Sequence, residues 1–407
     1  MIGYLEEGLA SVINQCRSQM ISFCQRLVQT PSLPGGEGDV AESVRAEMEL
    51  LGYDEVWVDD WGNVVGLLRG LGTGRSLMFN GHMDHVDPGN PEEWPYPPYG
   101  GEIHEGRLWG RGAADMKGPL AAMIYAGGVL ARAAIHPPGD LYVAAVVQEE
   151  VGGLGTQKLV QNLRPDIAVV GEATSNQLAR GHRGRIELVV RVRGKSVHAS
   201  VPQKGVNPHA VLARFIQRLE TLALAQDETF GHSTVAPTVY RTDQRSSNVL
   251  PGEARVHLDW RNVPGETRED VIAQLQPVLD ACLAEVEGSH GELLVHTRDL
   301  RTHTGRIEAF PAVFPSYGLD ADHRLVVDGQ QVLARALSRP VDIVTWDFAT
   351  DGGHLMAAGV PTVGFGPAEA SAAHIVGESV PLEMLAEGLL GYAALALELG
   401  TRQEFGS

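Results

Sequence analysis

The chain has 407 residues, of which 43% are hydrophobic and 20% charged, a composition typical of a globular protein and not of a disordered one. At roughly 150 residues per domain, we expect about two or three domains. The formal net charge of −19 disfavours nucleic acid and anionic membranes as partners. Three widely spaced cysteines, Cys16, Cys24 and Cys282, form no disulfide framework, which favours a reducing, cytoplasmic compartment. The first residues lack a basic flank and a long apolar run, so we expect neither a signal peptide nor a membrane span.

Helices and strands alternate in the first part of the chain, which predicts an α/β layer structure. Helical periodicity occurs at about 5–28, 40–51, 116–134 and 155–163. Between these segments, residues 55–68 read as one or two strands, and short apolar runs at 76–79, 141–147 and 167–170 are typical of buried strands.

The pattern changes after about residue 183. Strand-like and helical segments then follow at 186–192, 208–224, 234–241, 254–260, 267–286 and 292–297, in the order β-α-β-β-α-β. The α/β pattern resumes with a helix at 325–337, strands at 341–345 and 362–365, and a helix at 382–399. We therefore predict a discontinuous catalytic domain, 1–182 and 301–407, with a mixed sheet flanked by helices. An α+β domain is inserted at 183–300.

Side chains that bind metals follow several of the predicted strands. In chain order they are His82 and Asp84 after 76–79, Asp115 before the helix at 116–134, Glu149 and Glu150 after 141–147, Glu172 after 167–170, and His374 after 362–365. The carboxyl ends of parallel strands are where α/β sheets place their ligand sites. Taken singly, a histidine after a strand is more often a hydrogen-bonded loop residue, and adjacent glutamates are usually a solvated pair. Together, histidines and carboxylates at strand ends suit zinc, and one aspartate can bridge two ions.

The sequence resembles a family of metallopeptidases that includes aminoacylase, acetylornithine deacetylase, succinyl-diaminopimelate desuccinylase and glutamate carboxypeptidase. The resemblance covers nearly the whole chain and rests on GHMD (81–84), GAADMKG (112–118), EEVG (149–152), GE (171–172) and the late His374. The stretches HMDHVDPGN (82–90) and RGHRGR (180–185) look closer to an acetylornithine deacetylase-like branch without an assigned substrate.

This resemblance implies a centre of two metal ions, zinc by preference, with cobalt or manganese suited to the same ligands. Asp115 would bridge the two ions. His82 and Glu172 would complete one site, and Glu150 and His374 would complete the other.

The resemblance also implies roles for two carboxylates beside the metals. Asp84 would fix the ring of His82 by a hydrogen bond. Glu149 would be the general base that takes a proton from the attacking water and delivers it to the leaving amine. Because neighbouring strand residues point to opposite faces, Glu149 and Glu150 can both reach the metals only if the strand has ended before them.

The inserted domain carries further matches to the family. His198, in GKSVHAS (194–200), would reach the partner subunit's active site and donate a hydrogen bond to the developing oxyanion. Asn248 and Arg261 also match, and Arg261 would bind a substrate carboxylate. For Arg261 a surface salt bridge is the competing interpretation.

A glycine loop near the end of the chain matches a family loop that lines the substrate pocket. Gly352 and Gly353 in DGGH (351–354) would let backbone amides approach the substrate. The pattern assigns no role to His354, and His85 beside the metal motif is expected to be a supporting or surface residue.

From these implications we expect a hydrolase that cleaves the amide bond of an N-acyl amino acid, a small substrate with a free carboxylate. We also expect a homodimer formed through the inserted domain, which would close as a lid. The main alternative is a dipeptidase or carboxypeptidase with the same metals. A non-catalytic homologue and an amidohydrolase acting on carbamoyl groups are two further alternatives.

Overall fold

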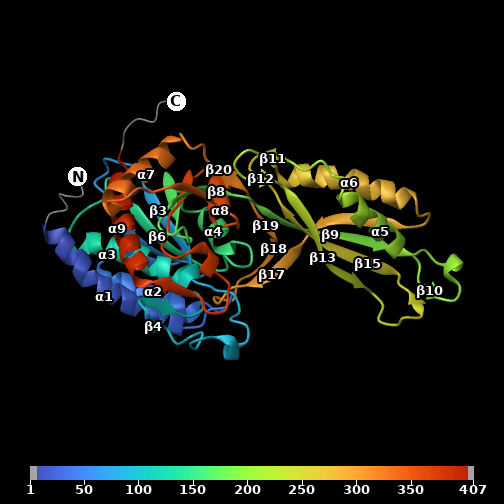
Figure 1. The fold of residues 1–407 in the computed structure, drawn as a ribbon, viewed down its shortest axis with the longest axis horizontal. Coiled ribbons are helices and arrows are strands. Elements are labelled where there is room, and N and C mark those ends of the chain that lie inside the picture. The colour runs from blue at the N-terminus through green and yellow to red at the C-terminus, as the bar shows by residue number, and fades with distance from the viewer. Residues whose placement is uncertain (1–6, 402–407) are drawn as a thin grey trace.

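The computed structural model describes residues 7–401, with side chains from residue 12 onward, so the first residues of the predicted helix at 5–28 lie outside the described part. Two bodies lie along the long axis of the molecule (Figure 1). The larger one is formed by the first and last parts of the described chain, and the smaller one by the middle of the sequence. Each body has an apolar core of its own.

The larger body is built on a nine-stranded mixed sheet, which confirms the predicted fold class. The four central strands run parallel to one another: β6 (Leu141–Val146), β3 (Leu77–His82), β7 (Ile167–Val170) and β22 (Thr362–Gly364). Nearly all their residues are buried, which accounts for their apolar sequences. The outer strands of this sheet are β1 (Glu55–Val58), β2 (Val64–Leu68), β8 (Leu178–His182), β20 (Tyr317–Gly318) and β21 (Ile343–Trp346).

Helices cover both faces of this sheet. One face packs against α1 (Glu7–Gln29), α2 (Gly38–Leu51), α3 (Gly118–Arg132), α7 (Arg324–Leu337) and α9 (Leu382–Glu398). The other face packs against the short helices α4 (Leu154–Leu159) and α8 (Gly352–Ala357). Alternate residues of β3 enter the two cores, with Leu77 and Phe79 on one side and Met78 on the other.

The smaller body has a five-stranded sheet with helices on one face only. Its elements are β9 (Arg185–Arg193), α5 (Pro208–Leu219), β13 (Thr234–Thr242), β15 (Glu253–Arg261), α6 (Arg268–Ala284), β16 (His290–Val295) and β19 (Val313–Phe314). Alternate apolar residues of β9 and β15 pack against α5 and α6, while charged residues occupy the opposite face. Apart from β19, the order is the predicted β-α-β-β-α-β.

Several short elements were not expected from the sequence. They are β4 (Glu102–His104), β5 (Arg107–Trp109), β10 (Val197–His198), β11 (Gln226–Asp227), β12 (Gly231–His232), β14 (Val249–Leu250), β17 (Thr297–Arg301), β18 (Ile307–Pro311) and β23 (Ser379–Pro381). In addition, the predicted glycine loop at 351–354 starts helix α8.

The domain boundaries near 183 and 300 stay predictions, although β19 pairs with β9 and extends the inserted sheet to residue 314.

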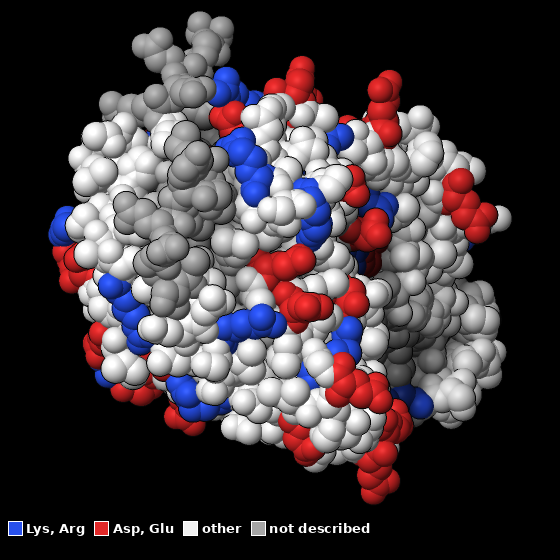
Figure 2. All heavy atoms as spheres, turned by 60° about the vertical axis from the view of Figure 1, so that its left-hand side comes forward, with Lys and Arg blue, Asp and Glu red and all other residues white. Residues whose placement is uncertain are grey.

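The acidic excess of the chain is not gathered into one patch on the face of the larger body that Figure 2 shows. Acidic and basic side chains alternate there, which is the arrangement of an ordinary solvated surface. Among residues 7–401, no helix combines the length and the apolar character needed to cross a membrane.

Candidate metal centre

The five predicted metal ligands meet at the carboxyl edge of the central parallel strands. His82 ends β3, Glu150 lies in the turn after β6, and Glu172 follows β7. Asp115 comes from η3 (Ala113–Lys117), the irregular turn that leads into α3, and His374 lies in the loop before β23. Four of the five side chains are at least nine-tenths buried, and His374 is half exposed.

Asp115 lies between two pairs of ligands. Its Oδ1 is 3.0 Å from Nε2 of His82, and its Oδ2 is 3.1 Å from Nε2 of His374. Glu172 Oε1 approaches the same nitrogen of His82 at 3.4 Å, and Glu150 Oε2 approaches that of His374 at 3.1 Å. The two oxygens of one carboxylate therefore face two different histidine–glutamate pairs.

These spacings fit metal coordination. Ligand atoms bonded at about 2.0–2.1 Å to a tetrahedral ion are roughly 3.3 Å apart. The neighbouring ligand atoms here are separated by 3.0 to 3.4 Å. Two imidazoles combined with carboxylates suit zinc and the neighbouring divalent ions. The donor set therefore has both the chemistry and the spacing for two ions that share Asp115.

In the absence of metal, these ligands would hold protons. Burial by itself would lower the pKa of His82, but hydrogen bonds that its ring donates to the carboxylates of Asp115, Asp84 and Glu172 hold this pKa well above its ordinary value. Hydrogen bonds to Asp115 and Glu150 raise the pKa of His374 to about 10. Burial, with the nearby Asp115 charge, raises the pKa of Glu150 to about 7. Metal binding must therefore displace protons.

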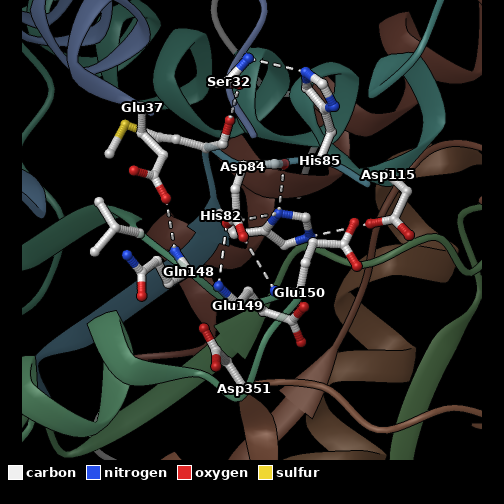
Figure 3. A network of polar contacts seen from close by, with 12 residues as sticks. Ser32, Glu37, His82, Asp84, His85, Asp115, Gln148, Glu149, Glu150 and Asp351 are labelled. Atoms are coloured by element: carbon white, nitrogen blue, oxygen red, sulfur yellow. Dashed lines mark hydrogen bonds and ion pairs between the residues drawn. The ribbon is translucent and has the colours of Figure 1, made fainter. Parts of the chain in front are cut away.

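The turn after β6 directs two neighbouring glutamates toward the same place (Figure 3). The strand ends at Val146, and Gln148 adopts a left-handed φ of 55°. The backbone N–H groups of Glu149 and Glu150 then donate to the two carboxylate oxygens of Asp84, at 3.1 and 3.2 Å. The alternation of an extended strand has thus ended, and both side chains reach the carboxyl edge of the sheet.

Glu149 is buried beside the ligands without being paired with a histidine. One of its oxygens lies within 4.8 Å of ligand atoms of both His82 and Glu172. Burial raises its pKa well above the ordinary value for a glutamate. A raised pKa suits a carboxylate that must take up a proton and then release it.

The ring of His82 is oriented by Asp84, mainly through the backbone. Nδ1 of His82 lies 3.0 Å from the backbone carbonyl oxygen of Asp84 and 3.5 Å from its Oδ1. With Nδ1 donating to the carbonyl, Nε2 is left free to face Asp115 and Glu172. The carboxylate of Asp84 mainly serves the backbone of Glu149 and Glu150.

Comparison with known proteins identifies the family. The sequence profile described as peptidase family M20/M25/M40 matches residues 78–398, which is most of the chain. The chain belongs to peptidase family M20/M25/M40. Its metal-ligand geometry and this membership make it a metal-dependent hydrolase.

Individual relatives of the M20/M25/M40 family extend over most of the chain. YgeY of Escherichia coli K12, described as uncharacterised, is 29% identical and the match covers 94% of each chain. An acetylornithine deacetylase of Proteus mirabilis is 28% identical over 90% of this chain and 92% of its own. The crystal structure of aminopeptidase PepT from Bacillus cereus superposes with a TM-score of 0.73 at 20% identity, covering 93% of this chain and 98% of that one. This last similarity shows the shared fold.

A buried ion pair that the sequence did not point to holds the Asp115 turn in this M20/M25/M40 centre. Oε1 of Glu378 accepts hydrogen bonds from the backbone N–H groups of Ala114 and Asp115, at 2.8 and 3.0 Å. Its Oε2 pairs with Arg111 at 2.5 Å, and both side chains are buried. The one hint in the sequence is that Glu378 follows His374 by four residues.

A second carboxyl group missed by the sequence, that of Asp351, lies below Glu149 in Figure 3. Its Oδ2 accepts a hydrogen bond from Thr156 at 2.6 Å, and Thr156 accepts one from Asn80 at 2.8 Å. Oδ1 of Asp351 is buried, and no group of the described residues forms a hydrogen bond with it. Burial raises the pKa of Asp351 to about 7.

The two glycines that follow Asp351 are buried in helix α8. A Cβ on Gly352 would meet the ring of Tyr317 at 2.7 Å, and one on Gly353 would meet the carbonyl oxygen of Pro315 at 2.0 Å. Their lack of a side chain therefore allows the 315–317 segment to pack closely. Their predicted role in the substrate pocket stays a prediction.

The two unassigned histidines are buried supports of neighbouring loops. His354 donates from Nε2 to the backbone oxygen of Gly152 at 2.8 Å. His85 accepts from the backbone N–H of Ser32 at 2.9 Å and donates to the oxygen of Val86 at 2.8 Å. Burial lowers the pKa of both histidines to about 4, so they are neutral at pH 7.

The predicted site residues of the smaller body are not at the metal centre of their own chain. His198 and Asn248 are exposed on the adjoining β10–β14 segment, at the end farthest from the larger body (Figure 1). Arg261 lies at the other end of β15, where it donates to Asp259 at 2.6 and 3.3 Å. The nine residues of β15 separate these positions by roughly 26 Å at about 3.3 Å per residue.

Proposed function

We propose that this protein hydrolyses the amide bond of an N-acyl amino acid at a centre of two metal ions, with zinc as the preferred metal. The observation that carries the proposal is the placement of Asp115, whose two oxygens face two different histidines at 3.0 and 3.1 Å. His82 and Glu172 would hold one ion, Glu150 and His374 the other, and Asp115 both.

The catalytic steps fall to Glu149 and its surroundings. The two bound ions would acidify a shared water molecule and polarise the scissile carbonyl group. Glu149 takes a proton from the attacking water and returns it to the leaving amine. Its burial and raised pKa support this double role, because the proton must be accepted and released in one turnover. Asp84 keeps the Glu149 backbone in place during both steps.

His198 completes the site from a second subunit. The distance of β10 from the metal centre of its own chain supports action in trans, with His198 donating to the oxyanion and Asn248 beside it. Strand β13 supports a homodimer through the inserted body, because it is an edge strand with nearly every residue exposed. The subunits would then share their active sites.

The substrate's free carboxylate is assigned to Arg261. This guanidinium is paired with Asp259, so a substrate carboxylate must compete with that contact. Gly352 and Gly353 would line the same pocket through their backbone. These assignments concern substrate selection and leave the hydrolytic step unchanged.

A dipeptidase or carboxypeptidase is the second candidate, since it would use the same ligands and the same base. The similarity to a deacetylase supports the first candidate, whereas the similarity in fold to aminopeptidase PepT is compatible with the second. The two reactions differ only in the group beyond the scissile bond.

The test is turnover of a panel of N-acetyl amino acids, dipeptides and N-carbamoyl amino acids by metal-stripped protein. Zinc, cobalt or manganese is added back, with Glu149→Gln as the inactive control. Release of acetate that depends on metal and on Glu149 supports the proposal. Cleavage of dipeptides alone would replace it with the peptidase, and release of ammonia and carbon dioxide would indicate a carbamoyl hydrolase.

A further inference from the structure

Strands β17 and β18 form a two-stranded ribbon that projects from the inserted sheet onto the larger body. The chain leaves that sheet at β16, forms the ribbon, and returns to it as β19. Both β16 and β19 pair with β9. In Figure 1 the ribbon lies between the two bodies.

At the base of the ribbon, two backbone hydrogen bonds join it to Glu187 of β9, and a third joins its two ends to each other. His296 donates to Glu187 at 2.8 Å, Glu187 donates to Ala312 at 3.0 Å, and Ala312 donates to His296 at 2.8 Å. The ribbon therefore begins and ends at one point of the inserted sheet. Its position is set by the position of that sheet.

The body of the ribbon contacts the turn that carries Glu149 and Glu150. On one side of the two glutamates, Nε2 of Gln148 donates to the backbone oxygen of Arg301 at 2.7 Å. On the other side, the ring of Phe310 packs so closely against Gly152 that a Cβ added there would lie 2.7 Å from the ring. Phe310 also forms a small apolar cluster with Leu300 and Leu154, against which Val151 packs.

This turn depends on such outside support, because its own conformation is irregular. Gln148 has a φ of 55°, and Gly152 and Gly153 have φ of 145° and 77°. A non-glycine residue in the left-handed region persists where its surroundings hold it there. The backbone N–H groups of the turn are held from the larger body, by Glu37 at 3.2 Å for Gln148 and by Asp84 for the next two residues. The ribbon holds the opposite side.

The far end of the ribbon is attached elsewhere on the larger body. Thr304 donates from Oγ1 to the backbone oxygen of Asp60 at 2.9 Å, and Arg306 pairs with the carboxylate of Asp60. These two contacts are on the same ribbon but do not involve residues 148–154. They provide matched controls for the contacts that do.

We propose that the ribbon is a positioning element for Glu149, with Gln148 and Phe310 as the positioning residues. Through them the inserted sheet of a chain sets the place of the general base in that same chain. The effect on kcat that this proposal predicts rests on the hydrolytic function proposed above. A displacement of about 1 Å at a reacting group can reduce turnover about 100-fold, so contacts that do not touch substrate can still control kcat.

The experiment compares Gln148→Ala and Phe310→Leu with the control variants Thr304→Val and Arg306→Ala, all in the full-length, metal-loaded protein. We expect kcat to fall about 10- to 100-fold in the first pair, with KM, metal content and melting temperature close to those of the controls. Backbone amide hydrogen exchange at residues 149–155 should be faster in the first pair than in the controls.

Equal kcat and equal exchange at 149–155 in both pairs would overturn the proposal. So would a loss of kcat that follows the loss of bound metal, because the ribbon would then support the centre as a whole. If Phe310→Leu does not fold, Gln148→Ala still decides. If the wild-type protein hydrolyses no substrate in the panel, the proposed function fails, while the exchange comparison still tests the ribbon.

Discussion

The carboxyl edge of the large sheet and the far end of the inserted sheet both carry predicted active-site residues, but their surroundings differ. At the sheet edge His82 is 1% exposed and contacts three carboxylates, those of Asp84, Asp115 and Glu172. At the far end His198 is exposed, and among the described residues its ring forms hydrogen bonds only with its neighbour Ser200, whose Oγ lies 2.8 Å from Nδ1.

This difference separates a preformed site from residues whose proposed role requires a second chain. Buried polar groups are stable only when other groups satisfy them, so the ligand set is held in place before substrate or metal arrives. An exposed histidine on a two-residue strand has no such support. Its proposed catalytic role therefore requires a second chain to bring it to the metal centre.

Replacing the general base should have the largest effect. Glu149→Gln is expected to lower kcat about 10²- to 10⁴-fold, because the amide cannot take the proton from water. Both metals should remain bound, since the five proposed ligands are intact. Steady-state kinetics with metal analysis measures both effects, and the exposed Glu92→Gln is the control. Full activity in Glu149→Gln would remove Glu149 from the mechanism.

The next test addresses the exposed end of the inserted body. His198→Ala should lower kcat about 10²- to 10³-fold through the loss of an oxyanion donor. Mixing it with Glu149→Gln under conditions that allow subunit exchange should restore roughly a quarter of wild-type activity, because half of the dimers are mixed and one site in each is intact. No recovery in a mixture with proven exchange would contradict action in trans.

A smaller effect is expected from the carboxylate that supports the turn after β6. In Asp84→Asn the amide group cannot accept both backbone hydrogen bonds, from Glu149 and Glu150, so one buried N–H loses its partner. Metal affinity should fall about 10- to 100-fold. Competition with a chelating dye measures it. The exposed Asp87→Asn is the control, and equal affinity in the two variants would show that Asp84 does not support the site.

The smallest expected effect is the release of protons when metal binds. Since the pKa of His374 is raised to about 10, its ring is protonated at pH 7 without metal. Metal loading at pH 7 should release about one proton from this ring, and affinity should rise with pH up to about 10. Calorimetry in buffers of different ionisation enthalpy measures the release, and His374→Gln should lower it by about one. Identical heats in all buffers would contradict this.

Sequence reasoning was most effective where a pattern is local. The apolar run of β6 and its two following glutamates are contiguous, so burial and the strand end could be predicted together. It was least effective where a short segment takes its conformation from distant contacts. The ribbon of β17 and β18 has no periodicity that distinguishes it from a loop, and α8 begins at two glycines that usually indicate a loop.

The order of strands and polar residues in the sequence by itself determined that the site would be suited to metal. Parallel strands bring their carboxyl ends to one edge, so histidines and carboxylates placed there had to meet in a site suited to metal. Only the tertiary structure decided which oxygen of Asp115 faces which histidine, and which groups hold the turns that carry Asp115 and Glu149. Those supports are contacts across the chain, with Gln148 and Arg301 separated by 153 positions and Ala114 and Glu378 by 264. Such pairs meet because the folded bodies pack together, and no local pattern in the sequence records that packing.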